Sequence, residues 1–121
     1  MDINTLKSHT KKLIEYNQFA LESYQKVRET KEPGDFFQDV KPFADRVKLL
    51  CDEWLPLAVN WIEVVRPKHI HTIQLNNVYE NIQMVSVRAF YPETSFKKFN
   101  SHIQSVDYVL KRFLEELESS E

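Results

Sequence analysis

The stretch KPFADRVKLLCDEWLPLAVNWIEVV, residues 41–65, decides the fold. Its large apolar side chains recur at alternating steps of three and four residues, which is the spacing of one face of an α-helix. These side chains are Phe43, Val47, Leu50, Trp54, Leu57, Trp61 and Val64. Pro42 suits a first helical turn, where its missing N–H has no partner to lose. Pro56 lies inside the pattern, and because the spacing continues beyond it we expect a kinked helix.

Three further segments show the same spacing, and each is bounded by residues that break helices. We expect the four helices at about residues 3–31, 41–65, 72–91 and 95–118. Pro33 and Gly34 separate the first pair, Pro67 follows the second helix, and Pro92 ends the third. Short connections make consecutive helices antiparallel neighbours. The sequence therefore predicts an all-α protein, a single up-down-up-down antiparallel four-helix bundle that forms one domain over residues 1–121.

Composition excludes several classes of function. Gly34 is the single glycine, so the glycine-rich loops that bind phosphates and dinucleotides are excluded. Cys51 is the single cysteine, which excludes an internal disulfide and a cysteine zinc cluster. The formal charge of −2 argues against a dedicated nucleic-acid binder. No apolar run is long enough to span a membrane and the chain does not open like a signal peptide, so we expect a cytoplasmic protein without membrane association.

Three stretches resemble a known family. They are Asp35-Phe36-Phe37 leading to Lys41-Pro42, then Trp54, then Arg66-Pro67-Lys68-His69-Ile70-His71 with Gln74. Together they resemble the YppE-like family, small bacterial helical-bundle proteins classed as a domain of unknown function. The resemblance extends over nearly the whole chain, and residues 66–71 are its most specific part. It implies a helical bundle in the cytoplasm, and it implies no catalytic, cofactor-binding or ligand residues. Pro56 is a departure from the pattern that we expect in relatives.

The histidines and the cysteine do not form a catalytic or metal-binding pattern. In an antiparallel bundle, His69 and His71 lie near the termini and close to His9, whereas His102 lies nearer the middle. A metal site needs three or four converging ligands, and no Asp or Glu falls on the four apolar faces. We therefore expect no catalytic residues, no metal and no cofactor. Cys51 flanks the apolar face and is expected to be a buried or half-buried, unreactive thiol.

A basic loop between the second and third helices is a candidate anion or partner site. It consists of Arg66, Lys68, His69 and His71. The free N–H groups at the start of a helix already favour an anion, so a phosphate, a nucleotide or an acidic peptide fits this position. The alternative is internal pairing, because Glu115, Glu116 and Glu118 end the last helix at the same end of the bundle. Internal neutralisation of Arg66 and Lys68 is the interpretation we favour.

Aromatic side chains gather in or beside the breaks at the opposite end of the bundle. This candidate interaction end consists of Phe36, Phe37, Phe90, Tyr91 and Phe96. If several are exposed, they form an apolar patch of the kind that marks a binding surface. If they cover the core, they are structural, and the sequence favours neither alternative. Phe36 and Phe37 are expected to fold back over this end of the core.

The sequence thus favours a non-catalytic protein-interaction module that docks an unidentified protein partner or a second copy of itself. An anion-binding module that uses Arg66, Lys68, His69 and His71 is the alternative. A metal-binding protein or an enzyme is a third hypothesis, since a fold alone excludes neither.

Overall fold

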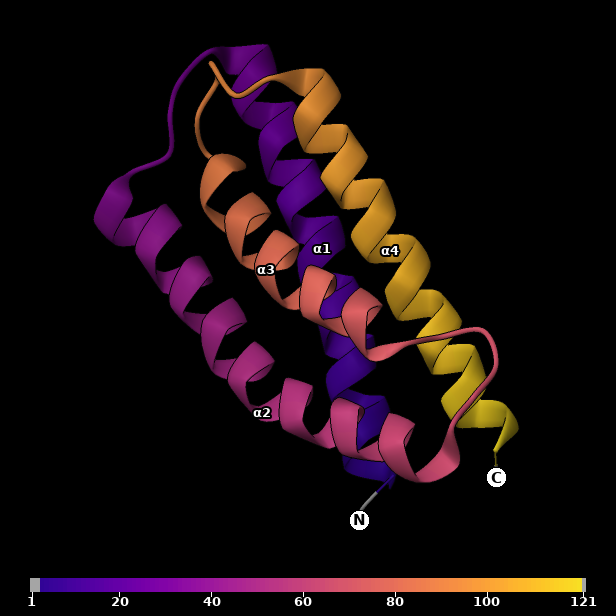
Figure 1. Cartoon of the computed structure of the whole chain (residues 1–121). Coiled ribbons are helices and arrows are strands. Elements are labelled where there is room, and N and C mark those ends of the chain that lie inside the picture. The colour runs from indigo at the N-terminus through magenta and orange to yellow at the C-terminus, as the bar shows by residue number, and fades with distance from the viewer. Residues whose placement is uncertain (1–2, 121) are drawn as a thin grey trace.

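Four α-helices and one short π-helix make up the computed structural model, which describes residues 3–120 (Figure 1). Their bounds are α1 Ile3–Thr30, η1 Phe36–Val40, α2 Lys41–Val65, α3 Thr72–Arg88 and α4 Phe96–Ser119. Each helix runs antiparallel to the next, and the start of α1 lies at the same end of the bundle as the end of α4 (Figure 1). The predicted all-α four-helix bundle is confirmed. Within the described residues, no helix is both long and apolar enough to cross a membrane.

The π-helix η1 lies between the first break and α2 and was absent from the sequence prediction. The Asp35 carboxylate accepts hydrogen bonds from the backbone N–H groups of Phe37 and Gln38, at 2.9 and 2.8 Å. The Asp39 carboxylate accepts in return from the backbone N–H of Asp35, at 2.8 Å. These two side chains satisfy donors that a helix start otherwise leaves without partners, so they stabilise η1 immediately before α2 begins.

α3 ends at Arg88, three residues before the predicted end at residue 91. The chain then forms tight turns, in which Phe90 N–H donates to the Val87 carbonyl and Tyr91 N–H donates to the Arg88 carbonyl. Tyr91 precedes Pro92, and a residue in that position is pushed out of the helical conformation. The Ser95 side chain then caps α4 by accepting from the backbone N–H of Lys98.

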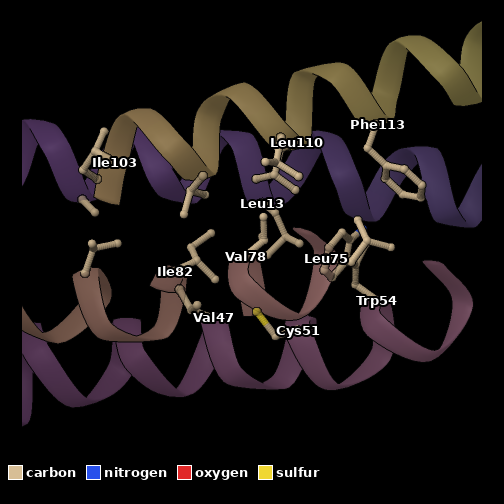
Figure 2. Packing of buried hydrophobic residues seen from close by; sticks show 14 of the residues in the cluster. Leu13, Val47, Cys51, Trp54, Leu75, Val78, Ile82, Ile103, Leu110 and Phe113 are labelled. Carbon is tan, nitrogen blue, oxygen red and sulfur yellow. The ribbon is translucent and has the colours of Figure 1, made fainter. Parts of the chain in front are cut away.

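α2 continues without a break through Pro56, as the spacing predicted, but its buried face differs from the predicted one. Its buried residues are Phe43, Val47, Cys51, Trp54, Ala58, Trp61 and Ile62. Leu50 and Leu57 are only half-buried, and Val64 is exposed. The cause is the pitch of the helix, because a pattern of alternating threes and fours has a period of 3.5 residues and drifts off the face of a straight helix. Figure 2 shows Cys51 on the inner face of α2.

Thr10 and Asn17 are uncharged polar residues on the buried face of α1. Thr10 Oγ1 donates to the Leu6 carbonyl at 2.8 Å and accepts from the indole N–H of Trp54 at 3.0 Å. Asn17 Nδ2 donates to the backbone carbonyl of Ile103 on α4 at 2.9 Å. Asn17 Oδ1 is buried without a hydrogen-bond partner among the residues described. These hydrogen bonds link α1 to both of its neighbours, α2 and α4.

Candidate functional site

The connection between α1 and α2 carries two exposed aromatic side chains. Phe36 is 52% exposed and Phe37 is 77% exposed. The two rings meet edge to face, with their centroids 5.2 Å apart. The expectation that they fold back over the core is therefore wrong. The π-helix is the reason, because it directs Val40 into the core in their place and leaves both rings in solvent.

The other three aromatic residues of this end have different environments. Phe90 is a core residue, which meets Phe43 edge to face and accepts a 2.8 Å backbone hydrogen bond from Gly34. Tyr91 is half-buried. Phe96 is exposed and lies beneath the guanidinium of Arg28, 5.8 Å from the ring centroid. Both alternatives left open by the sequence therefore apply, with Phe90 in the core and Phe36, Phe37 and Phe96 at the surface.

A crevice opens beside the first connection and has a volume of about 430 Å³. We call it the α1 crevice. One side is a single face of α1, and the rest is the segment after α1, the η1 carboxylate Asp39 and the core ring of Phe90. Its lining residues are Phe19, Glu22, Ser23, Lys26, Val27, Thr30, Glu32, Pro33, Gly34, Asp39 and Phe90. The sequence pattern does not indicate this crevice, because its lining residues are distant from one another along the chain.

Phe19 connects the α1 crevice to a second depression along α1. Phe19 is 48% exposed although its ring meets that of Phe43 on α2 in an edge contact, with ring centroids 4.8 Å apart. The second depression, of about 630 Å³, shares Phe19 and Glu22 with the crevice, and Tyr16 and Phe43 also line it. Phe19 lies at the edge of the buried face of α1, beside Ala20, and an aromatic residue at such an edge is a sequence signal that could have indicated a groove.

The basic loop is organised by its backbone. Arg66 adopts a left-handed conformation with φ of 52°, and its N–H donates to the Ile62 carbonyl at 2.8 Å, which ends α2. His71 is the N-cap residue of α3, and the Gln74 side chain accepts from the His71 backbone N–H at 2.8 Å. The Gln74 N–H donates to the His71 carbonyl at 3.0 Å. Residues 66–71, the most specific part of the family resemblance, thus end α2 and lead into the start of α3.

The predicted pairing of this loop with the acidic end of α4 is wrong. Glu115 and Glu116 instead lie 3.8 Å from Arg112 on their own helix. Arg66, Lys68 and His69 are exposed, and none has an ion pair with an acidic residue between positions 3 and 120. Residues three and four apart are neighbours on a helix surface, so Arg112 reaches Glu115 and Glu116 without any ordering of the loop.

The remaining reactive side chains do not converge. His9 Nε2 lies 3.3 Å from Glu53. No group of three or more His, Cys, Asp and Glu side chains in the described part of the chain is placed to hold a metal ion. Cys51 is fully buried, and its desolvation raises the pKa of the thiol to about 12. A thiol with such a pKa is protonated near neutral pH and is a poor nucleophile.

Solved structures of other bacterial proteins share this architecture. A protein of unknown function from Listeria innocua is 36% identical with a TM-score of 0.90, and the match covers 95% of this chain and 92% of that one. The crystal structure of protein YppE from Bacillus subtilis is 27% identical with a TM-score of 0.93, covering 99% and 98%. A domain of unknown function from Staphylococcus aureus, 21% identical with a TM-score of 0.88 over 97% and 99%, shares the fold.

The sequence comparisons agree with the structural ones. The uncharacterized protein YppE of Bacillus subtilis is 27% identical over 113 residues, which cover 93% of this chain and 92% of that protein. The profile of a bacterial domain of unknown function, DUF1798, matches residues 10–117. The resemblance to the YppE-like family is thereby confirmed, and this chain belongs to the bacterial family of unknown function DUF1798.

Proposed function

We propose that this chain is a non-catalytic, cytoplasmic protein-interaction module that docks a partner protein through Phe36 and Phe37. The observation that carries the proposal is the exposure of two adjacent aromatic rings, 52% and 77%, in a segment with its own hydrogen-bonded caps. Aromatic side chains supply large contact areas and dominate many protein interfaces. Neither ring belongs to the hydrophobic core of the bundle.

The backbone beneath the two rings supports this proposal. Asp35 accepts from the N–H groups of Phe37 and Gln38, and Asp39 accepts from the N–H of Asp35. The backbone that carries the two rings is therefore already ordered. Binding of a partner to these rings costs less conformational entropy than binding to rings on a flexible loop.

The test compares the double variant Phe36→Ser/Phe37→Ser with the wild-type chain and with Phe96→Ser, a control from the same end that removes another exposed ring. Each tagged protein is isolated from its source bacterium at low and high salt, and co-purifying proteins are quantified. We expect the double variant to lose a stoichiometric partner while it keeps its circular dichroism spectrum, and Phe96→Ser to retain that partner. Unchanged co-purification would contradict the proposal, and loss of the fold would assign both rings to the core.

Anion binding at the basic loop is a second candidate function. The observation in its favour is that Arg66, Lys68 and His69 have no acidic partner between positions 3 and 120. Binding of phosphate, nucleotides or short nucleic acids should weaken steeply with salt and should be lost in Arg66→Glu/Lys68→Glu. The absence of any interaction in a low-salt titration would remove this candidate.

A further inference from the structure

The α1 crevice lies next to the exposed aromatic pair, and η1 contributes to both. Asp39 of η1 lines the crevice, whereas Phe36 and Phe37 of the same short helix point to solvent. The apolar part of the lining is formed by Phe19, Val27 and Phe90 with Pro33. A partner that covers the aromatic pair is therefore in reach of an apolar depression of about 430 Å³.

The charged side chains around this depression are mostly acidic. Glu22, Glu32 and Asp39 provide three carboxylates, and Lys26 provides the single ammonium. None of the four forms an ion pair within the part of the chain that the structure describes. The protein contacts of the carboxylates are neutral: Glu22 accepts from the Gln18 amide at 3.2 Å, and Asp39 accepts from the backbone of Asp35. Among the described residues, the rim thus carries three carboxylates against one ammonium, and none of these carboxylates forms an ion pair.

An apolar floor with an acidic rim matches the chemistry of an arginine or lysine side chain. Such a side chain lays its aliphatic stem on apolar surface and keeps its charged head at the edge. A guanidinium also stacks on aromatic faces and binds carboxylates in a fork. A partner segment with acidic side chains would be repelled by the carboxylates of the crevice. A purely apolar segment would remove water from these carboxylates without offering them a hydrogen bond or a charge in return.

We propose that the α1 crevice receives an arginine or lysine side chain, flanked by apolar residues, from the partner protein. This inference rests on the proposed function, since it names the chemistry of the segment that docks beside Phe36 and Phe37. The partner's basic side chain lies between α1 and the segment that follows it, with its charge at the acidic rim that carries Glu22, Glu32 and Asp39.

The test uses the full chain and two matched peptides. Acetyl-Leu-Arg-Leu-amide is compared with acetyl-Leu-citrulline-Leu-amide, in which a neutral group of nearly the same shape replaces the guanidinium. Gly34 lines the crevice and is the single glycine, so its amide signal reports binding in ¹⁵N-labelled protein. We expect the arginine peptide to shift the Gly34 signal in a saturable manner, with an affinity several-fold higher than that of the citrulline peptide and reduced by salt.

Charge variants distinguish an effect of the carboxylates at the crevice rim from an effect of the protein's net charge on peptide affinity. Glu22→Gln/Glu32→Gln should weaken the arginine peptide by a factor of about two to five for each carboxylate removed, the range for exposed ion pairs. Glu63→Gln/Glu80→Gln removes the same charge from exposed glutamates outside the crevice and should leave the affinity unchanged. A third variant, Ser23→Trp, places a ring in the crevice from the helix surface and should block both peptides without unfolding α1.

Each result decides for or against the inference. Equal shifts with both peptides, or the same affinity in Glu22→Gln/Glu32→Gln, would overturn it. A Gly34 shift that grows with protein concentration in the absence of peptide would assign the crevice to a second copy and would also overturn it. If the Phe36→Ser/Phe37→Ser variant loses its partner while Gly34 does not respond to the arginine peptide, the proposed function stands and this inference fails. If the Phe36→Ser/Phe37→Ser variant keeps its partner while Gly34 responds to the arginine peptide, the crevice is a binding site and the proposed docking through the aromatic pair is wrong.

Discussion

The hydroxyl of Tyr79 on α3 donates a 2.6 Å hydrogen bond to the carboxylate of Asp52 on α2. The Nζ of Lys48, one turn earlier on α2, lies 3.0 Å from the same carboxylate. The Tyr79 hydrogen bond, followed by the Lys48 hydrogen bond, holds the pKa of Asp52 below its ordinary value of 3.8. The Asp52 hydrogen bond and charge raise the pKa of Lys48 above 10.5.

Tyr79→Phe should therefore change the pH dependence of the free energy of unfolding. A carboxyl whose pKa is lowered by folding stabilises the protein above the unfolded pKa of 3.8, and this contribution is lost as the pH falls through the lower folded value. We expect Tyr79→Phe to raise the pKa of Asp52 and to unfold at lower urea than the wild type near neutral pH. The difference should shrink as the pH falls below 3.8. Carbon-detected NMR titration of Asp52 checks the first result, and a difference that persists in acid contradicts the second.

Cys51 should be unreactive in the folded protein. Its side chain is fully buried, and burial raises the pKa of the thiol to about 12. At about pH 8, a disulfide reagent should label Cys51 only through opening of the bundle, so the labelling rate should rise with urea in parallel with unfolding. Cys51→Ser should lower the free energy of unfolding by about 1–3 kcal/mol, because it buries a hydroxyl at an apolar position. Rapid labelling of the native chain would contradict this prediction.

Trp54→Phe should cost more stability than Trp61→Phe. Both indoles pack edge to face on Phe113, with centroids 6.0 and 5.6 Å away. Trp54 also donates a buried hydrogen bond to Thr10, which the substitution removes together with part of the ring. We expect Trp54→Phe to lower the free energy of unfolding by about 1–3 kcal/mol more than Trp61→Phe does in urea denaturation. Equal losses would show that the Thr10 contact contributes nothing beyond packing.

Gly34→Ala should destabilise the connection between α1 and α2 through a steric clash with Phe90. A Cβ at this position would lie 2.8 Å from both Cβ and Cδ1 of Phe90, closer than real side chains approach. The Phe90 side chain is buried, and Gly34 N–H donates to its carbonyl, so neither residue can move freely. We expect a loss of about 1–3 kcal/mol in the free energy of unfolding, the usual cost of overpacking. Pro33→Ala, at the exposed neighbour, is the control, and a thermal midpoint of Gly34→Ala equal to that of the wild type would contradict the prediction.

The four helices were predictable because their apolar spacing and their prolines agree. α2 begins at Lys41, beside Pro42, and ends at Val65, the residue before Arg66-Pro67. The buried face of α2 was less predictable, since the spacing alone does not distinguish a period of 3.5 residues from one of 3.6. That small difference accounts for the burial of Cys51 and for the exposure of Val64.

The candidate sites were predictable only as sets of residues, not as surfaces. Phe36 and Phe90 are both aromatic residues beside a break, yet one is exposed and the other is core. Their difference depends on η1, which arises from the hydrogen bonds of Asp35 and Asp39 rather than from any apolar pattern. The α1 crevice could not be predicted, because it needs the relative placement of α1, η1 and Phe90.

Thr10 and Asn17 lie one heptad apart on α1, and each makes its hydrogen bond to a different neighbouring helix. An apolar stripe alone tolerates sliding, because a shift by one helical turn, about 5.4 Å, brings similar side chains back into contact. A shift of α1 by one turn would separate Thr10 from the Trp54 indole and Asn17 from the Ile103 carbonyl at the same time. The two polar residues therefore act against registry errors, and they favour one alignment of α1 over its slipped alternatives at some cost in buried apolar area.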